Sequence, residues 1–469
     1  MAETKTNVPS VIFREYDIRG IADVHLTYEN LHEIARAYAT YLLEHGKKKI
    51  LIAGDVRLST PRIKQTLISS LLECGISVVD LGVTTTPHFY WSLFNTELDS
   101  GIMVTGSHNP PDQNGLKLAL DKVTLWGDQI KSLYRIICNN AFKTTGEKGT
   151  LEELWTRDRY LEDLKNRITL GSRKLKIVCD CANGTEGFYA KQFFESIGCQ
   201  VTVLYDDPDG RFPNHHPDPT IKANMVDLQK EVLRQGADFG VGFDGDADRI
   251  GVVTDKGVMI SGDRLMALFW KEILPKHPGA VGICEVKASL CLPEIIERFG
   301  GKVVWGASGH SLIKAKMREL NALFSGEVSG HICFADEYYG FDDALYAAGR
   351  LARYMSNSHR SISEELADIP VYPITIETRY PCYDEIKFDV VAKLAEKAKA
   401  DFGDRVLTVD GARIQYDYGW GLLRASNTQP VLVTRCEART VEDLQYIMND
   451  MKRRIIEAGS PNFYYEIQE

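Results

Sequence analysis

The chain has 469 residues, and at roughly 100 to 200 residues per domain this length predicts three or four domains. Hydrophobic residues make up 44% and charged residues 26%, a soluble globular balance that excludes a mainly disordered protein. The formal net charge of -10 disfavours nucleic-acid and anionic-membrane binders, which need a basic surplus. No uncharged apolar stretch reaches 18 residues and no signal-peptide pattern opens the chain, so we expect a cytoplasmic enzyme without nucleic-acid or membrane partners.

A weak internal repeat is the most informative pattern along the chain. An apolar run, a polar loop and a helical segment begin within residues 48–60, 173–187 and 278–290, and a second apolar run opened by glycine follows each of them. A third run then leads into an unusual loop, in GIMVTGSHNP from residue 101, DFGVGFDGDADR from residue 238 and ALFSGEVSGH from residue 322. Strand, helix and strand in this order predict three similar α/β domains with mixed, mostly parallel sheets.

The pattern changes after about residue 366, where prolines punctuate the chain and alternating apolar runs follow. This change predicts a smaller C-terminal α+β domain. We place the domains at residues 1–152, 153–256, 257–368 and 369–469, with a hinge near residues 366–372. Ligands of open α/β sheets bind beyond the carboxyl ends of the strands, so we expect four domains whose loops meet around a central cleft.

The first unusual loop, TGSHNP, carries Ser107 and His108 directly after an apolar run. A serine held on a tight loop bounded by glycine and proline suits a nucleophile. Ser, Asn, Gly and Pro are also common in plain turns, so the motif by itself leaves that alternative open. His108 is a candidate general base, although adjacent side chains need not converge.

The second loop, DGDADR, alternates Asp244, Asp246 and Asp248 with small residues. In an extended strand the three carboxylates would share one face about 7 Å apart, too far for one ion, but a turn at Gly245 could gather them. Three hard oxygen donors suit Mg²⁺, and three close anions would repel one another without a cation. The alternative is a solvated acidic turn.

Two other motifs overlap this segment and fail. Glycines at 240, 242 and 245 match GxGxxG, but carboxylates fill the turn that would hold a pyrophosphate. An EF-hand loop needs glycine where Arg249 stands and glutamate where Asp255 stands.

Two further loops carry polar groups suited to a sugar phosphate. GEVSGH presents Glu327, Ser329 and His331 at alternating positions, which could hydrogen-bond vicinal hydroxyls, with a polar hairpin as the alternative. RASNTQP combines a guanidinium with hydroxyl and amide groups, as phosphate recognition requires; its candidates are Arg424, Ser426, Asn427 and Thr428.

Taken in chain order, FREYDIRG, TGSHNP, DGDADR, GEVSGH and RASNTQP resemble the motifs of the α-D-phosphohexomutase superfamily, nearest to its bacterial phosphomannomutase/phosphoglucomutase branch. The resemblance spans essentially the whole chain. Val328 departs from the methionine that is usual in this branch, which leaves the preferred sugar open.

The resemblance implies reversible phosphoryl transfer between C1 and C6 of mannose and glucose phosphates. Ser107 would carry the phosphoryl group, and a hexose 1,6-bisphosphate would serve as intermediate and activator. One Mg²⁺ per chain would be held by phosphorylated Ser107 with Asp244, Asp246 and Asp248. Lys117 and His331 would handle protons beside Ser107 and His108. The implied substrate-binding residues are Tyr16, Arg19, Arg249, Lys287, His310, Glu327, Ser329, Arg424, Ser426, Asn427 and Thr428.

Three alternatives stay open at this stage. A phosphoglucosamine mutase would share most of the motifs, but GEVSGH lacks the glutamine that we associate with that activity. A serine-nucleophile sugar phosphatase would share the phosphoserine and the metal, and a sugar-phosphate sensor would share only the fold. We expect a monomer, with a weak dimer as the alternative.

Overall fold

The computed structural model describes residues 7–426 and 430–465, and the chain divides into two compact units. Unit 1 comprises Met1–Ile260 and Ser329–Glu365, and unit 2 comprises Ser261–Val328 and Leu366–Glu469. The chain therefore passes between the units three times, and one passage lies inside the GEVSGH motif. Among the described residues, no helix combines the length and apolarity that crossing a bilayer requires.

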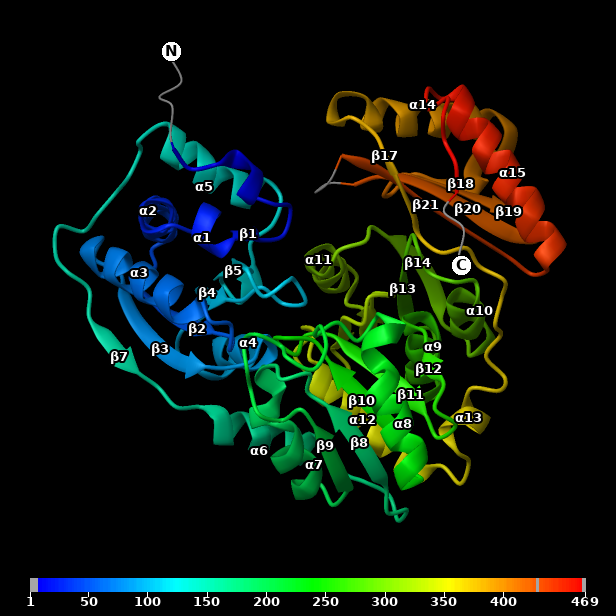
Figure 1. The fold of residues 1–469 in the computed structure, drawn as a ribbon, viewed down its shortest axis with the longest axis horizontal. Helices are drawn as coiled ribbons and strands as arrows, with labels where there is room; N and C mark the ends of the chain where they lie inside the picture. The colour runs from blue at the N-terminus through cyan, green and yellow to red at the C-terminus, as the bar shows by residue number, and fades with distance from the viewer. Residues whose placement is uncertain (1–6, 427–429, 466–469) are drawn as a thin grey trace. The chain divides into compact units, whose positions relative to one another are not determined.

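The first repeat forms a seven-stranded mixed sheet in unit 1, ordered β1-β5-β4-β2-β3-β7, with β6 paired to β5 (Figure 1). Its central strand reads KILIAG, a nearly continuous apolar run that suits a strand covered on both faces. Helix α2 begins where Thr27 caps the backbone N–H of Asn30 and buries one side against the core. The strands are β1 (Ile18–Ile21), β2 (Lys49–Gly54), β3 (Ser77–Val83), β4 (Gly101–Val104), β5 (Gln113–Leu120), β6 (Val123–Thr124) and β7 (Leu151–Glu153); the helices are α1 (Ala22–His25), α2 (Tyr28–Glu44), α3 (Thr60–Glu73), α4 (Thr86–Asn95) and α5 (Asp128–Cys138).

The second repeat, also in unit 1, forms a five-stranded sheet in the order β12-β11-β10-β8-β9. The parallel strands β10, β8 and β9 match β4, β2 and β3 of the first repeat, and in both repeats an antiparallel strand follows the unusual loop. The elements are α6 (Arg157–Arg167), β8 (Lys176–Asp180), α7 (Ala190–Ser196), β9 (Gln200–Leu204), α8 (Val226–Gln235), β10 (Phe239–Phe243), β11 (Ile250–Thr254) and β12 (Met259–Ile260).

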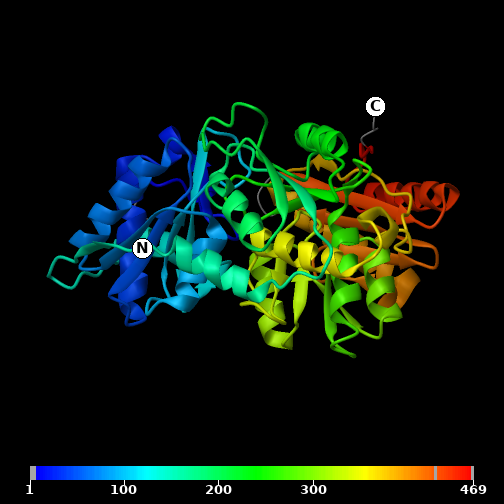
Figure 2. The same ribbon diagram turned by 90° about the horizontal axis from the view of Figure 1, so that it is seen from below.

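The third repeat places its parallel strands in the same order, with β13 between β14 and β15. The predicted internal repeat is therefore confirmed by strand order as well as by sequence. Both views show the blue to cyan chain of the first repeat as one continuous body (Figure 1 and Figure 2). The third-repeat elements are α9 (Gly262–Ile273), β13 (Val281–Glu285), α10 (Cys291–Arg298), β14 (Lys302–Gly306), α11 (His310–Leu320) and β15 (Phe324–Gly326) in unit 2, then β16 (Ile332–Phe334), α12 (Ala344–Asn357) and α13 (Ile362–Glu365) in unit 1.

The C-terminal part of unit 2 is an α+β domain with a five-stranded antiparallel sheet, β17-β21-β20-β19-β18, packed against α14 and α15 (Figure 1). The predicted change of architecture is confirmed, and the whole chain has a four-domain α/β fold. Its elements are β17 (Thr378–Pro381), α14 (Asp384–Phe402), β18 (Val406–Leu407), β19 (Ala412–Tyr416), β20 (Gly419–Ala425), β21 (Val431–Ala438) and α15 (Val441–Glu457).

The C-terminal domain packs on the third repeat through a buried arginine. Arg413 of β19 donates to the carbonyls of Val286 and Ala288 at 2.7 and 2.8 Å, and its guanidinium lies 4.2 and 3.9 Å from the rings of Trp305 and Trp420. Because a buried cation between two aromatic faces adds cation–π attraction to packing, this contact stabilises unit 2.

The exact domain limits and the hinge near residues 366–372 stay predictions. The start of the hinge segment is bound to the third repeat, where Arg264 donates to the Leu366 carbonyl at 2.8 Å and Lys271 pairs with Asp368 at 2.8 Å.

Candidate active site

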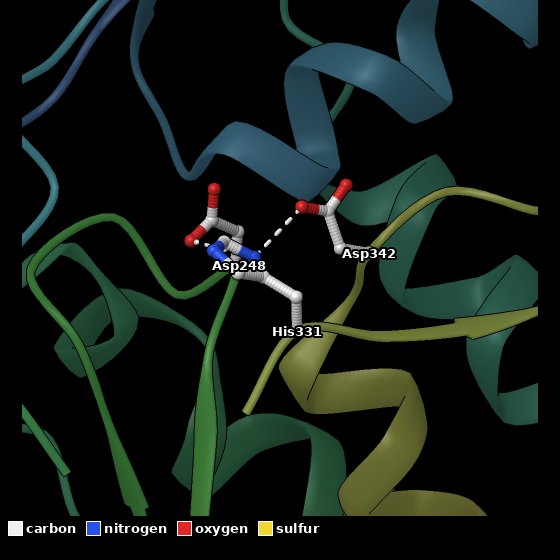
Figure 3. A group of neighbouring side chains, drawn as sticks. All are labelled: Asp248, His331 and Asp342. Atoms are coloured by element: carbon white, nitrogen blue, oxygen red, sulfur yellow. Dashed lines mark ion pairs between the residues drawn. The ribbon is translucent and has the colours of Figure 1, made fainter. Parts of the chain in front are cut away.

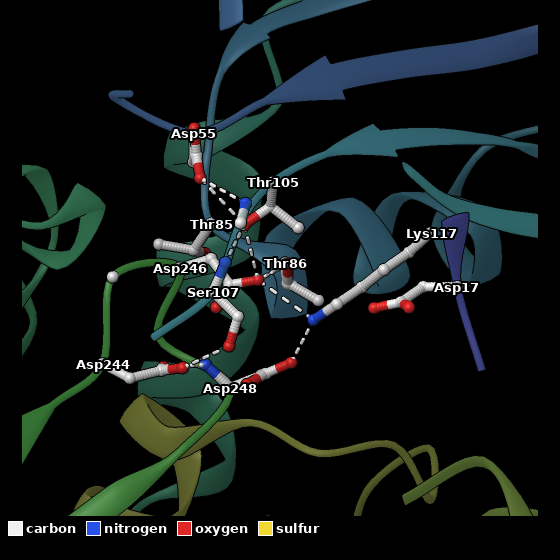
Figure 4. A network of polar contacts seen from close by, with 12 residues as sticks. Asp17, Asp55, Thr85, Thr86, Thr105, Ser107, Lys117, Asp244, Asp246 and Asp248 are labelled. Carbon is white, nitrogen blue, oxygen red and sulfur yellow. Dashed lines mark hydrogen bonds and ion pairs between the residues drawn. The ribbon is translucent and has the colours of Figure 1, made fainter. Parts of the chain in front are cut away.

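Ser107 lies on the loop that joins β4 to β5, beyond the carboxyl end of β4. Its Oγ donates to Asp244 Oδ2 at 2.8 Å (Figure 4). The same oxygen lies 3.1 Å from His108 Nδ1. Ser107 has φ 49°, in the left-handed region that residues other than glycine seldom adopt. The sequence motif thus forms a tight, strained loop whose hydroxyl faces the acidic loop of the second repeat.

The acidic loop joins β10 to β11 and brings its three aspartates together. One oxygen from each of Asp244, Asp246 and Asp248 lies within 4.8 Å of the others, and all three residues are fully buried. A Cβ on Gly245 would lie only 2.6 Å from the Ser107 carbonyl oxygen, so glycine permits this approach of the two loops. The turn expected at Gly245 therefore gathers the carboxylates as the motif indicated.

Lys117 on β5 is the ammonium that faces this acidic cluster. Its Nζ contacts Asp248 and lies 3.0 Å from Asp246 Oδ2 (Figure 4). Burial disfavours the charged amine, but Asp246 and Asp248 raise the pKa of Lys117 well above its usual value. Burial and the charges of Asp246 and Asp248 also raise the pKa of Asp244. Lys117 thus contacts two of the three carboxyl groups.

The donor set fits a small, hard cation such as Mg²⁺. Lys117 Nζ donates hydrogen bonds to the Oδ2 atoms of Asp246 and Asp248. The Oδ1 atoms of the same two residues accept no hydrogen bond from any described residue. The third oxygen, Asp244 Oδ2, is the one that Ser107 contacts. Buried carboxylate oxygens without a donor are costly, and a divalent cation would satisfy them.

Two threonines that were not among the predicted site residues help to fix Asp246. Thr86 Oγ1 donates to Asp246 Oδ2 at 2.6 Å, and Thr105 Oγ1 lies 3.0 Å from the same oxygen (Figure 4). Thr105 is the first residue of the TGSHNP motif, so its place in the loop was visible in the sequence. Thr86 begins α4 in another part of the first repeat and carried no such signal.

His331 forms a second cluster in unit 1 (Figure 3). Arg249 Nε donates to His331 Nε2 at 3.0 Å, while His331 Nδ1 lies 2.9 Å from Asp342 Oδ2 and 3.5 Å from Asp248 Oδ1. Because Nε2 accepts from Arg249, the proton of a neutral ring sits on Nδ1, the nitrogen that lies nearer to the Asp342 carboxylate. Asp342 was not predicted, since nothing in GFDDALY distinguishes it as the partner of a histidine eleven positions away.

Arg19 brings a further cation to the serine loop. It donates to Asn109 Oδ1 at 2.9 Å and pairs with Asp17 at 2.5 Å. Burial, with the charges of Arg249 and Arg19, holds the pKa of His108 well below its ordinary value, so this ring is neutral. Tyr16 is partly buried on the same N-terminal stretch.

In unit 2, the predicted sugar-binding residues lie on loops that follow the parallel strands of the third repeat. Glu327 follows β15 and accepts a hydrogen bond from the Gly309 backbone at 2.8 Å, next to His310 at the start of α11. Lys287 follows β13, and its Nζ lies 3.8 Å from Glu285 and 3.9 Å from Glu377. These residues share one edge of the sheet because parallel strands end on the same side.

Arg424 near the end of β20 pairs with Asp410 in the present structure. Its Nε and Nη2 lie 3.2 and 3.0 Å from the two oxygens of this carboxylate, which also accepts the Ser308 N–H at 3.2 Å. Asp410 was not predicted. Ser426 is buried, and the predicted Asn427 and Thr428 lie outside the described residues.

The structure therefore brings the predicted residues together in two groups. Unit 1 holds the serine loop, the aspartates, Lys117, Arg249, Ser329 and His331, and unit 2 holds Lys287, His310, Glu327, Arg424 and Ser426. The convergence of both groups on one substrate stays a prediction.

Three similar α/β repeats and a C-terminal α+β domain, with a buried serine–aspartate site beyond the ends of strands, define a four-domain α/β protein. The phosphoglucomutase/phosphomannomutase α/β/α domains I, II and III match residues 10–144, 158–257 and 261–372, and the C-terminal domain of the same family matches residues 377–454.

Curated relatives match along almost the whole chain. A phosphomannomutase/phosphoglucomutase of Pseudomonas aeruginosa is 40% identical over 96% of this chain and 96% of its own, and a phosphoglucomutase of Neisseria meningitidis is 38% identical over 98% and 100%. A crystal structure of a phosphoglucomutase/phosphomannomutase family protein from Burkholderia thailandensis matches with a TM-score of 0.92 and 38% identity, over 98% of this chain and 100% of that one. The chain belongs to the phosphoglucomutase/phosphomannomutase family, within the α-D-phosphohexomutase superfamily.

Proposed function

We propose that the chain catalyses reversible phosphoryl transfer between C1 and C6 of glucose and mannose phosphates, through phosphorylated Ser107 and a hexose 1,6-bisphosphate. The observation that carries the proposal is the 2.8 Å contact of Ser107 Oγ with the buried aspartate cluster. A family membership that spans all four domains supports the same activity.

In the first half-reaction, the bond from phosphorus to Ser107 Oγ breaks and a bond to the free sugar hydroxyl forms. The sugar hydroxyl loses its proton, and Ser107 regains one. Among the described residues, His108 Nδ1 and Asp244 Oδ2 lie within hydrogen-bond reach of Ser107 Oγ and are our candidates to exchange that proton. Lys117 and His331 are our further candidates for proton handling, with Lys117 in the donor role because its raised pKa keeps it protonated.

Phosphoserine carries about 1.5 to 2 negative charges near neutral pH, so another oxygen attacks it only when that charge is spread. A bound Mg²⁺, held by Asp244, Asp246 and Asp248 with the phosphoserine, would supply this positive charge. Lys117 and Arg19 of this chain add fixed cations beside the loop, and Lys117 remains protonated because its pKa is raised.

The other substrate residues would hold the sugar and the phosphate that does not react. Glu327 and Ser329 would accept hydrogen bonds from sugar hydroxyls, and Arg424 with Ser426, Asn427 and Thr428 would bind the distal phosphate. Tyr16, Arg249, Lys287 and His310 would complete the binding site. The bisphosphate would reorient between the half-reactions, and its second phosphate would return to Ser107.

To test this function, the purified protein is incubated with glucose 1-phosphate or mannose 1-phosphate, Mg²⁺ and a trace of the matching 1,6-bisphosphate. Phosphorus NMR then follows the sugar phosphates and inorganic phosphate over time. We expect the 6-phosphate to accumulate and intact-mass analysis to find one phosphoryl group on Ser107. Stoichiometric inorganic phosphate without 6-phosphate would indicate a phosphatase, and neither product would indicate a sensor. Side-by-side kinetics with glucosamine phosphate test the phosphoglucosamine mutase alternative.

A further inference from the structure

Arg57, on the loop between β2 and α3, is a fully buried arginine that no motif singled out. Its Nη1 donates to the carbonyls of Pro110 and Gln113 at 2.6 and 2.9 Å, and its Nη2 donates to those of Ser107 and Asn109 at 2.6 Å each. Two terminal nitrogens carry four N–H groups, so every one of them is committed to a backbone carbonyl of the serine loop or of Gln113 at the start of β5. The guanidinium therefore has no terminal donor left for a substrate.

The serine loop depends on this contact for its shape. Ser107 is held at φ 49°, a conformation that is costly for a residue with a side chain unless its surroundings impose it. Gly106 lies so close to the guanidinium that a Cβ there would be 2.5 Å from Arg57 Nε. Arg57 thus packs flat against Gly106 and fixes the carbonyls on either side of the reactive hydroxyl.

Asp55, two residues before Arg57, accepts hydrogen bonds from N–H groups of the backbone around the serine loop. One carboxylate oxygen accepts the Gly106 N–H at 3.1 Å and lies 2.9 Å from Thr105 Oγ1, while the other accepts the Arg57 N–H at 3.0 Å (Figure 4). Thr105 Oγ1 in turn accepts the Ser107 N–H at 2.9 Å. Asp55 and Arg57 together therefore bind both the donors and the acceptors of the loop backbone.

We propose that Arg57, supported by Asp55, is the positioning residue that keeps Ser107 Oγ aligned with the aspartate cluster for phosphoryl transfer. The inference rests on the proposed function and adds to it a residue that touches neither substrate nor reacting atoms. Lysine cannot replace Arg57, because an ammonium has three N–H groups for four buried carbonyls and lacks the planar fork.

The test compares Arg57→Lys with the wild-type protein in three measurements: kcat and KM for glucose 1-phosphate, the rate of Ser107 phosphorylation by glucose 1,6-bisphosphate, and the thermal midpoint. We expect kcat and the phosphorylation rate to fall about 100-fold, because small misplacement of a reacting group has effects of this size. KM should stay within about twofold, since no substrate contact is lost.

The matched control is Arg350→Lys, which removes another fully buried guanidinium of unit 1. Arg350 makes a two-pronged pair with Asp336, both at 2.9 Å, and none of its described contacts lies in the serine loop. We expect this variant to lose thermal stability while retaining kcat. Adding methylguanidinium to the Arg57→Ala variant should restore part of its rate of Ser107 phosphorylation. The same addition should leave the phosphorylation rate of the Arg350→Ala variant unchanged.

Wild-type kcat in Arg57→Lys, or an equal kcat loss in Arg350→Lys, would overturn the proposal. If Arg57→Lys does not fold, Asp55→Asn is the variant to test, since the asparagine amide keeps the shape of the carboxylate but loses one acceptor oxygen. We expect this variant to show the same loss of kcat with unchanged KM. Loss of folding in both variants, or wild-type kcat in a folded Asp55→Asn, would assign these residues to folding alone. A wild-type protein that neither isomerises sugar phosphates nor phosphorylates Ser107 would instead contradict the proposed function.

Discussion

Two arginines, one in each unit, make opposite use of the same side chain. Arg57 is fully buried and spends its terminal donors on the backbone of the serine loop, whereas the side chain of Arg424 is 14% exposed and pairs with the carboxylate of Asp410. Backbone carbonyls cannot leave Arg57 without unfolding the loop, but a phosphate can replace one carboxylate on Arg424. We infer that the site in unit 1 is preformed before substrate binds. In unit 2, a substrate phosphate can replace Asp410 as the partner of the Arg424 guanidinium.

Ser107→Ala tests the fixed site most severely. We expect activity to fall at least roughly 10⁴-fold, because the hydroxyl that would carry the phosphoryl group is lost. The thermal midpoint should change little, since the loop keeps its backbone bonds to Arg57. Ser92→Ala is the matched control, a buried serine whose hydroxyl donates to its own helix at the His88 carbonyl. Turnover near wild type in Ser107→Ala would end the assignment of the nucleophile.

Removing the metal or one of its ligands should have the next largest effect. We expect excess chelator to lower kcat more than about 100-fold and added Mg²⁺ to restore it, because the dianionic phosphoserine then loses its main counter-charge. Asp246→Asn should weaken Mg²⁺ binding in calorimetry as well as activity, since one of the unpaired buried oxygens is replaced. Full turnover in chelator would show that Lys117 alone satisfies the aspartates.

The sequence could predict what neighbours in the chain determine. Repeated apolar runs predicted three similar domains, because strand and helix order depends on local periodicity. The alternating aspartates of DGDADR predicted a carboxylate cluster, because that cluster needs only one turn at Gly245. Asp55, Asp342 and Asp410 could not be predicted in this way, since each acts on a residue outside its own segment and is recognisable only by contact. The division between units inside GEVSGH, between Val328 and Ser329, depends on packing and also carried no local signal.

Arg424→Ala tests the exchangeable site. We expect KM for glucose 1-phosphate to rise about 10- to 100-fold, which corresponds to about 1.4 to 2.8 kcal/mol at 1.4 kcal/mol per tenfold, with a smaller change in kcat. Arg424→Lys should lie between, because one ammonium replaces a two-pronged contact. Arg405→Ala is the matched control, since Arg405 makes an exposed pair with Asp417 at 2.8 Å in the same domain. Equal KM in the Arg424→Ala variant and the wild type would remove Arg424 from phosphate binding.

Asp410→Asn should give the smallest and most informative change. If phosphate replaces Asp410 on Arg424, the neutral amide competes less, and KM should fall roughly threefold, a difference of about 0.6 kcal/mol. The fall in KM should disappear in the Arg424→Ala background, because Asp410 then has no guanidinium with which to compete. Asp417→Asn controls for the loss of a surface charge. A rise in KM comparable to that of Arg424→Ala would mean the opposite, that Asp410 orients Arg424 for the phosphate, and both arginines would then be prearranged in the same way.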